Sequence, residues 1–362
     1  MNVAEVKTTI VNKPKPKPKP YEPFFVDEAA LKALKLVAVA YSKVERDDYA
    51  TQSAYEGELE VEDRAEEVIA EVAKLGIAVK GYAADQYFFT NILVDKPDLV
   101  LNLVDTVKGR DTLQPAIPGA LELSGIPYTG AGMRGLVLGN ERHLIKQILI
   151  AQDIPTPAYK YIKDLRFKIP EELGSPLIVK LNEGGGSVGI DNKAVKETVG
   201  QAQKKVAKML ETYRTPLIVE QFIDGPEITV VIYDDGRRRH IFVGQKIFKI
   251  KPDGKHDFTS FESYDDLWAY RYKVPEPAVL DKVAPLAIRA FEVLGYRDYA
   301  KFDIRWDEVT ATPYFIDSNP NTAFGPDKGL PMTEVLGLHR VEFTHILKSL
   351  LSKHARTAQR GV

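Results

Sequence analysis

Residues 177–190, LIVKLNEGGGSVGI, combine a short apolar strand with a glycine-rich turn. Lys180 stands near the end of the strand, and three successive glycines and Ser187 follow it. Residues without side chains let backbone N–H groups approach phosphate oxygens, and a lysine beside them can neutralise phosphate charge. The GxxxxGK[ST] order of a P-loop is absent. The segment predicts a phosphate-binding hairpin, although glycine clusters also mark turns that bind nothing.

Residues 217–232, LIVEQFIDGPEITVVI, place two carboxylates around a short apolar stretch. Glu220 stands at the end of one predicted strand and Glu227 at the start of the next. One carboxylate can accept a hydrogen bond from an adenine amino group and the other from ribose hydroxyls, with Phe222 and Ile223 flanking an apolar slot. Surface glutamates at strand ends are the alternative interpretation.

Residues 302–321, FDIRWDEVTATPYFIDSNPN, predict two paired strands with oxygen donors on one face. Asp317 and Asn319 point to the same side of their strand because strand side chains alternate, and Asp303 lies on the preceding strand. Hard oxygen ligands of this kind suit Mg²⁺, which also binds substrate phosphates. Polar residues on a solvated face are the alternative, which the apolar neighbours disfavour.

A charged helix is predicted over residues 139–152. Arg142 and Lys146 are four residues apart and therefore share one helix face. From that face both side chains could reach phosphate groups. A face that is simply solvated is the alternative.

Composition narrows the class of protein. The 362 residues carry 49 basic and 51 acidic side chains, so the balance of charge does not mark a nucleic-acid or membrane-surface binder. The absence of cysteine excludes disulfides, thiolate nucleophiles and Cys-ligated zinc. The six histidines show no metal spacing, and the start lacks an apolar signal core. We expect a soluble cytoplasmic protein that acts on small molecules.

The N-terminal pattern predicts an arm followed by an α/β lobe. Residues 13–20 alternate lysine and proline, which favours an extended, solvated segment. An apolar strand at 34–42, a periodic helix at 60–79 that ends at Gly76, and a strand at 97–105 form a strand–helix–strand unit.

The later pattern predicts antiparallel sheets. A helix within 114–130 breaks at Gly125, and short apolar strands begin at Pro176. A hairpin is expected to turn at Asp235-Gly236. The predicted α/β (α+β) fold therefore divides into an arm at 1–33, a parallel-sheet lobe at 34–137, and two antiparallel-sheet lobes at 138–216 and 217–362.

Taken in chain order, these segments resemble the ATP-grasp superfamily, and within it the D-alanine–D-alanine ligase branch of carboxylate–amine ligases. The similarity runs from about Leu34 to Leu350 and rests on GIPYTGAG, DIPTP, VKLNEGGGSVGI, VEQFIDGPEITV and the Asp…Asp-x-Asn pair. It implies three lobes, with ATP and Mg²⁺ (or Mn²⁺) between the two antiparallel sheets. The implied nucleotide and metal residues are Arg142, Lys146, Lys180, Gly185, Gly186, Ser187, Glu220, Phe222, Ile223, Glu227, Asp303, Asp317 and Asn319.

The substrate half of the sequence departs from that family. Gly186 replaces the first serine of a Ser-Ser-Val-Gly motif, and Lys301 replaces an arginine that stabilises the tetrahedral intermediate. Lysine is a point donor without the planar fork of arginine. Aligning Leu-Pro-Met places Lys328 near the position at which the family has a serine that contacts the second substrate's carboxylate. A lysine there would favour an anionic acceptor.

The segment 249–268 resembles the loop that closes over the reaction in the family. It lacks the lysine before the closing Tyr264, and Lys249 is a candidate replacement charge. The residues predicted to take part in catalysis are Lys301, Ser187 and Tyr264.

The resemblance implies a ligase that activates a carboxylate as an acyl phosphate and joins it to an amine, with amino acids as expected substrates. Because the substrate residues depart from the family, we expect a substrate other than D-alanine. True D-alanine–D-alanine ligation and a non-catalytic ATP-binding protein are the alternatives. A homodimer through the first lobe would be ordinary for this family.

Overall fold

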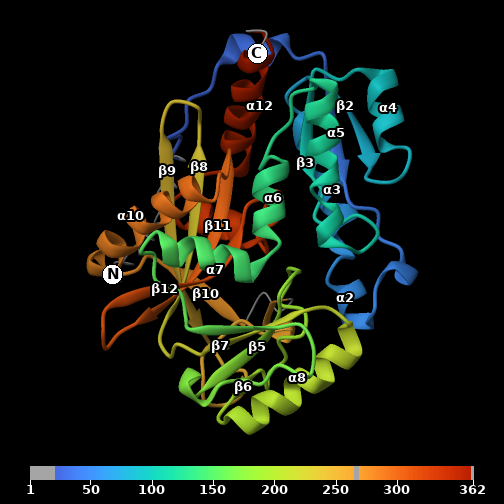
Figure 1. Cartoon of the computed structure of the whole chain (residues 1–362). Helices are drawn as coiled ribbons and strands as arrows, with labels where there is room; N and C mark the ends of the chain where they lie inside the picture. The colour runs from blue at the N-terminus through green and yellow to red at the C-terminus, as the bar shows by residue number, and fades with distance from the viewer. Residues whose placement is uncertain (1–20, 265–268, 360–362) are drawn as a thin grey trace, which may run out of the picture.

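The computed structural model describes residues 21–264 and 269–359, which form three sheets and the helices around them (Figure 1). One sheet is parallel, with the strand order β2-β1-β3. The other two are antiparallel, with the orders β10-β9-β8-β11-β12 and β4-β7-β5-β6. The predicted combination of one parallel-sheet lobe with two antiparallel sheets is confirmed. Within the described ranges, each helix is too short or too polar to cross a bilayer.

The parallel sheet forms the N-terminal lobe. Its strands are β1 (Leu36–Tyr41), β2 (Ala78–Ala83) and β3 (Leu99–Leu103). The helices beside it are α2 (Gln52–Glu56), α3 (Glu60–Ala73), α4 (Phe88–Asp95) and α5 (Ala116–Ser124). The sequence pattern did not predict β2. This edge strand is only partly buried, and it carries Lys80 and Gly81 in place of an apolar run.

The four-stranded sheet forms the central lobe. It contains β4 (Tyr159–Ile162), β5 (Leu177–Leu181), β6 (Val195–Lys196) and β7 (Leu217–Gln221), and α8 (Val199–Tyr213) packs on it. Because β7 pairs with both β4 and β5, a lobe boundary at 216/217 would cut this sheet. We therefore place the boundary after Gln221. The sequence of this short strand does not indicate which sheet the strand joins.

The five-stranded sheet forms the C-terminal lobe. Its strands are β8 (Glu227–Asp234), β9 (Arg239–Phe248), β10 (Tyr270–Lys273), β11 (Tyr299–Asp307) and β12 (Thr312–Asn319). Buried residues of α7 (Arg142–Ala151) and α10 (Pro277–Val293) share one apolar cluster with this sheet. The remaining helices are α6 (Met133–Gly139), α9 (Phe261–Tyr264), α11 (Pro331–Leu338) and α12 (Phe343–Gln359).

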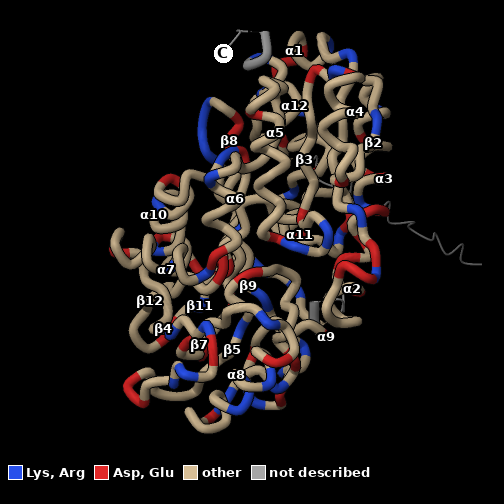
Figure 2. The backbone as a smooth tube through the Cα atoms, turned by 45° about the vertical axis from the view of Figure 1, so that its right-hand side comes forward, with Lys and Arg blue, Asp and Glu red and all other residues tan. Residues whose placement is uncertain are grey.

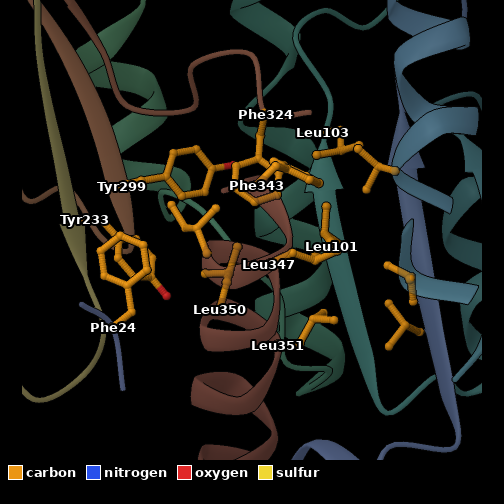
Figure 3. Packing of buried hydrophobic residues seen from close by; sticks show 14 of the residues in the cluster. Phe24, Leu101, Leu103, Tyr233, Tyr299, Phe324, Phe343, Leu347, Leu350 and Leu351 are labelled. Carbon is orange, nitrogen blue, oxygen red and sulfur yellow. The ribbon is translucent and has the colours of Figure 1, made fainter. Parts of the chain in front are cut away.

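Helix α12 joins the N-terminal and C-terminal lobes through one apolar core (Figure 3). Leu347, Leu350 and Leu351 of this helix are buried in the same cluster as Leu101 on β3 and Tyr233 on β8. Side chains of this size contribute roughly 1.5–3 kcal/mol each when fully buried. This shared core therefore fixes the two lobes relative to each other.

The predicted flexible arm at 1–33 needs a correction over residues 21–33. Phe24 is buried in the core and stacks on His345, and Asp27 caps the short helix α1 (Glu28–Ala33). An aromatic side chain and an N-cap give this stretch apolar burial and satisfied donors, which the lysine–proline repeat lacks. The repeat itself, within residues 1–20, lies outside the described residues.

Candidate active site

A cavity of about 210 Å³ lies where the three lobes meet. The central lobe contributes the glycine loop at 184–187, and the segment 220–223 joins it to the C-terminal lobe. The ends of β11 and β12 and the loop that follows them form a further side. We call the side built by α7 and the two antiparallel sheets the sheet wall. Its charged residues are Arg142, Lys180, Glu220, Glu227, Lys246, Lys301, Asp303, Arg305 and Asp317.

Arg142 begins α7 and points its guanidinium into the sheet wall. Its Nη2 donates to Asp317 Oδ2 at 2.9 Å, and its Nη1 donates to the carbonyl of Leu181 at 3.0 Å. Its Nε is buried and has no hydrogen-bond partner among the described residues. A buried donor without a partner is costly, so this group favours an anionic ligand in the cavity.

Glu220 on β7 is clamped between two lysines. Its Oε2 lies 3.0 Å from Lys180 Nζ, and its Oε1 lies 3.1 Å from Lys146 Nζ. Burial raises the pKa of Glu220, but the two lysines outweigh it and lower the pKa below its usual value. Burial lowers the pKa of Lys146, and Glu220 only partly offsets this effect. Lys180 lines the cavity, whereas Lys146 does not.

The glycine loop adopts left-handed backbone conformations that open it toward the cavity. Gly184 has φ 99° and Gly186 has φ 60°. A Cβ at Gly185 or Gly186 would meet no atom within 4 Å, so the backbone faces open space. Ser187 has φ 56°, which is unusual for a residue with a side chain and is often found at functional sites.

Arg305 of β11 packs against the segment that follows Glu220. Arg305 Nε donates to the carbonyl of Ile223 at 2.9 Å, and its guanidinium lies 4.8 Å from the Phe222 ring centroid. Both Phe222 and Ile223 are buried and line the cavity. The structure thus brings together an apolar slot and the carboxylate of Glu220, as the sequence predicted.

Glu227 begins β8 and forms a buried ion pair that the sequence analysis missed. Lys246 Nζ lies 2.7 Å from Glu227 Oε1, and the Thr259 hydroxyl donates to the same oxygen at 2.6 Å. Arg305 Nη1 lies 3.5 Å from Glu227 Oε2. Burial raises the pKa of Glu227, but Lys246 and Arg305 outweigh it and lower the pKa to about 2.

The hairpin register explains why Lys246 was missed. A turn confined to Asp235-Gly236 would place Gly244 opposite Glu227. The observed turn is longer, because Asp234 pairs with Arg239, and this shift brings Lys246 beside Glu227. Turn length fixes register in a hairpin, so a correct turn assignment would have predicted the contact.

Asp303 and Asp317 face each other across β11 and β12, and Lys301 is opposite Asn319. A β-bulge follows Asp303 and locally changes the register, as bulges next to functional sites often do. Lys301 Nζ donates to Asp303, just as Arg142 does to Asp317. Burial raises the pKa of Asp317, but Arg142 outweighs it and keeps the group ionised.

This donor set fits a magnesium ion. In the described part of the chain, there is no cluster of three or more His, Cys, Asp or Glu side chains that could hold a metal alone. Mg²⁺ characteristically takes one or two carboxylates and completes its shell with water and substrate phosphates. Asp303, Asp317 and the Asn319 amide, all lining the cavity, match that pattern.

Besides Lys146, three predicted residues are not among those that line the cavity. Lys249 and Lys328 are exposed, and neither is among the residues that line the cavity. Tyr264 ends α9, and its side chain lies outside the described part of the structure. The cavity is instead lined by Lys246, Arg305 and a group of carboxylates of the N-terminal lobe. The sequence motifs singled out none of these residues.

Comparison with known proteins agrees with this architecture. Residues 151–352 match the family model described as D-ala D-ala ligase C-terminus. A D-alanine–D-alanine ligase from Polaromonas sp. (strain JS666) is 30% identical over 241 residues, which cover 62% of this chain and 67% of the relative. The enzyme of the same name from Albidiferax ferrireducens is 29% identical over 228 residues, which cover 62% and 64%. The chain thus spans about two thirds of these relatives.

Solved structures show the same fold. A D-alanine–D-alanine ligase from Bacillus anthracis complexed with ATP has a TM-score of 0.69 at 18% identity and covers 91% of this chain and 100% of its own. A D-Ala:D-Ser ligase from Enterococcus faecalis has a TM-score of 0.64 at 16% identity, with coverage of 89% and 99%. The chain therefore belongs to the D-alanine–D-alanine ligase family, whose members are ADP-forming ATP-grasp ligases that make carbon–nitrogen bonds.

Proposed function

We propose that this chain binds ATP in the cavity, transfers the γ-phosphoryl group to a substrate carboxylate, and joins the resulting acyl phosphate to an amine other than that of D-alanine. The observation that carries the nucleotide half is the sheet wall. There Lys180, the glycine loop and the unpartnered Arg142 Nε converge on one space between two antiparallel sheets.

Most residues of the sheet wall have a role in this proposal. Arg142 and Lys180 hold phosphate oxygens, together with backbone N–H groups of the glycine loop. Ile223 and Phe222 enclose the adenine, while Glu220 accepts from its amino group and Glu227 from the ribose. Several of these groups are already held in ion pairs, so little reorganisation is needed when nucleotide binds.

Asp303, Asp317 and Asn319 would hold Mg²⁺, which supplies charge stabilisation for phosphoryl transfer. Lys301 lies beside Asp303 and is placed to neutralise negative charge on the reacting carboxylate. Because an acyl phosphate hydrolyses, the reaction must also exclude water. Thr259 and Phe258 line the cavity just before α9, so α9 lies next to the cavity along the chain.

The substrate proposal rests on differences from the family pattern. Gly186 and Lys301 both line the cavity, and each replaces a residue that handles substrate in a D-alanine ligase. Losing a hydrogen-bonding side chain or the fork of an arginine changes which substrate is bound well. D-alanine–D-alanine ligation is the second candidate, because the relatives carry that name.

The test is an ADP-release assay with ATP, Mg²⁺ and single amino acids of both configurations, followed by product mass. Release of ADP with a condensed product other than D-alanyl-D-alanine is the expected result. Efficient formation of D-alanyl-D-alanine would select the second candidate. ATP binding without ADP release on any substrate would favour a non-catalytic role.

A further inference from the structure

Lys246 of β9 lines the cavity, but the proposed reaction gives it no role. Only 6% of this residue is exposed. Burial lowers the pKa of Lys246, but Glu227 outweighs this effect and holds the pKa well above its usual value. Burying a charge is costly unless the charge is paired, so the role of Lys246 must lie in the groups that it contacts.

Lys246, Glu227 and Thr259 form a closed triangle of hydrogen bonds. Lys246 Nζ donates to Glu227 Oε1 and to the Thr259 hydroxyl, each at 2.7 Å. The same hydroxyl donates to Glu227 Oε1 at 2.6 Å. Each of the three side chains therefore fixes the orientation of the other two.

This triangle uses one oxygen of Glu227 and leaves the other with acceptor capacity. A carboxylate oxygen has two lone-pair sites, and Oε1 already accepts from two donors. The contacts of Oε2 are longer, with the Thr259 amide nitrogen at 3.3 Å and Arg305 Nη1 at 3.5 Å. Oε2 is therefore the oxygen that can accept a further hydrogen bond from a ligand in the cavity.

The surroundings of Lys246 favour a fixed position over a role as a mobile phosphate contact. Its Nζ lies 4.5 Å from the centroid of the Tyr270 ring, and β9 pairs with β10 so that Lys246 is opposite Tyr272. Two oxygens and one aromatic ring thus surround an ammonium group that has three N–H donors. Lys246 is suited to holding Glu227 in place.

Thr259 connects this triangle to the other lobes. We call residues 257–261 the strap. At its end, the Phe261 amide donates to the carbonyl of Ile190 in the central lobe at 2.7 Å. The Phe261 ring lies 3.4 Å from the point where a Cβ would stand on Gly57, just after α2. Figure 2 shows α9, which begins at Phe261, close to both α2 and the central lobe.

The strap also borders the apolar slot that we assign to adenine. Phe258 shares a buried cluster with Phe222 and with Ile178 of β5, and the two phenylalanine ring centroids are 6.3 Å apart. Phe258 and Thr259 are neighbours in the chain. The position of Thr259 therefore bears on both the adenine slot and the carboxylate assigned to the ribose.

Resting on the ligase function proposed above, we propose that Lys246 is a positioning residue for the ribose of the nucleotide. It holds the Glu227 carboxylate in one orientation, so that Oε2 accepts a hydrogen bond from a ribose hydroxyl, and it holds the strap through Thr259. Because these groups are ordered before the nucleotide arrives, little freedom is lost when it binds.

The experiment combines a substitution in the protein with a deletion in the ligand. Calorimetry with Mg²⁺ and without amino substrates measures the Kd of ATP and of 2′,3′-dideoxy-ATP. The natural protein should bind ATP at least about tenfold more tightly, which is the size of one hydrogen bond to a charged group. In Lys246→Met this preference should fall to about threefold or less, because the loss at Lys246 and the loss of the hydroxyls act on one contact.

A kinetic readout separates positioning from the chemical step. In the ADP-release assay, Lys246→Met should raise the KM for ATP at least about tenfold and change kcat by no more than about threefold. Lys246 contacts Glu227 and Thr259, neither of which we assign to the transferred phosphoryl group. An ion pair with a structural role alone would weaken ATP and the dideoxy analogue equally.

Lys282→Met is the matched control. Lys282 also lies over an aromatic ring, 5.7 Å from the Trp306 centroid, but it is exposed on α10 and is not among the cavity-lining residues. It should keep the preference for ATP. Circular dichroism checks that each variant folds. If Lys246→Met does not fold, Thr259→Val leaves the ion pair intact and should lower the preference about threefold.

The outcomes separate this inference from the ligase function. An unchanged preference for ATP in the folded variants, or no preference in the natural protein, would overturn the role of Lys246 and leave the ligase standing. Equal weakening of both nucleotides would also overturn it. The expected pattern of Kd values without ADP release on any substrate would support the role of Lys246 and remove the ligase. No ATP binding to the natural protein would refute the proposed function, and the role of Lys246 with it.

Discussion

The sheet wall and the N-terminal-lobe side of the cavity hold their carboxylates in opposite ways. We call the second surface the acidic wall, and it consists of Glu58, Glu60, Arg64, Asp105 and Asp111. Glu220, Glu227 and Asp317 on the sheet wall each lie against at least one cationic side chain, which keeps them ionised. Glu58 and Asp111 form no close ion pair among the described residues, and burial, which Arg64 and Arg142 only partly offset, raises the pKa of both. The carboxylates of the sheet wall are therefore paired closely with cations, and those two of the acidic wall are not.

This difference teaches how the pairing of a buried carboxylate sets its protonation. A buried ion pair is costly to desolvate but positions its groups rigidly, which suits a nucleotide and metal site. A buried carboxylate without a close ion pair is instead favoured in its protonated form. The sheet wall carries the motifs shared with D-alanine–D-alanine ligases, whereas the acidic wall carries none of them.

The largest effect is expected at the metal site of the sheet wall. Asp317→Ala combined with Asn319→Ala should lower ADP release by at least roughly 10²–10³-fold, because charge stabilisation of phosphoryl transfer is lost. Asp307→Asn, at the exposed end of β11, is the control and should keep activity. Turnover retained in the double variant, with folding confirmed by circular dichroism, would refute the metal assignment.

Loss of the ion pairs of Glu220 should have a large effect on the free energy of unfolding. Glu220→Gln leaves Lys146 and Lys180 buried without their carboxylate, and breaking a buried ion pair typically costs about 3–5 kcal/mol. The free energy of unfolding from urea titration measures this loss. Glu45→Gln, which breaks the exposed pair with Lys43, should leave it unchanged. An equal effect of both substitutions would contradict the clamp.

Lowering the pH should reduce the free energy of unfolding through the carboxylates of the sheet wall. The pKa of Glu227 is lowered to about 2 in the folded protein, so its contribution is fully present above about pH 4.5 and is lost as the pH falls toward 2. Between pH 6 and pH 3 the protein should lose about 2 kcal/mol through this group. Urea unfolding at both pH values should show a smaller loss for Glu227→Gln, and equal losses would argue against the pair with Lys246.

Acid should act in the opposite direction on the acidic wall. The pKa of Asp111 is raised to about 6, so its contribution to stability is fully present below about pH 4 and is lost as the pH rises through 6. The loss between pH 4 and pH 7 should be about 2 kcal/mol. Urea unfolding at pH 4 and pH 7 measures this loss, and Asp111→Asn should remove it.

The smallest effects should come from charges outside both walls. Lys328→Ala and Lys249→Ala should change kcat/KM by no more than about twofold, because exposed substitutions rarely cost more than ~0.5 kcal/mol. Steady-state ADP assays measure this, with Lys180→Ala as the positive control for a strong loss. A tenfold loss at Lys249 would instead indicate that the segment after β9 moves toward the cavity during the reaction.

Much of the fold and the sheet wall followed from local pattern. The strands around Lys180 and Glu220 and the pairing of Asp303 with Asp317 appear where the sequence predicted them. These features depend on alternation, turn residues and short spacings, which are properties of neighbouring residues. The partly buried β2 and the assignment of β7 to a sheet had no such local signal.

No sequence motif predicts the acidic wall. Glu58 and Glu60 flank the start of α3, whereas Asp105 and Asp111 follow β3. In the sequence each looks like a solvated charge on an exposed turn. Only the tertiary structure brings these carboxylates together at one cavity.

By itself the sequence determined the α/β class, the glycine loop and the oxygen donors of the proposed metal site, because each is fixed by residues close together in the chain. The tertiary structure decided which charges neutralise one another: Lys246 lies beside Glu227 through the hairpin register, and Glu220 lies between Lys146 and Lys180. Electrostatic pairing depends on distance in space and on exclusion of water, and a linear pattern specifies neither.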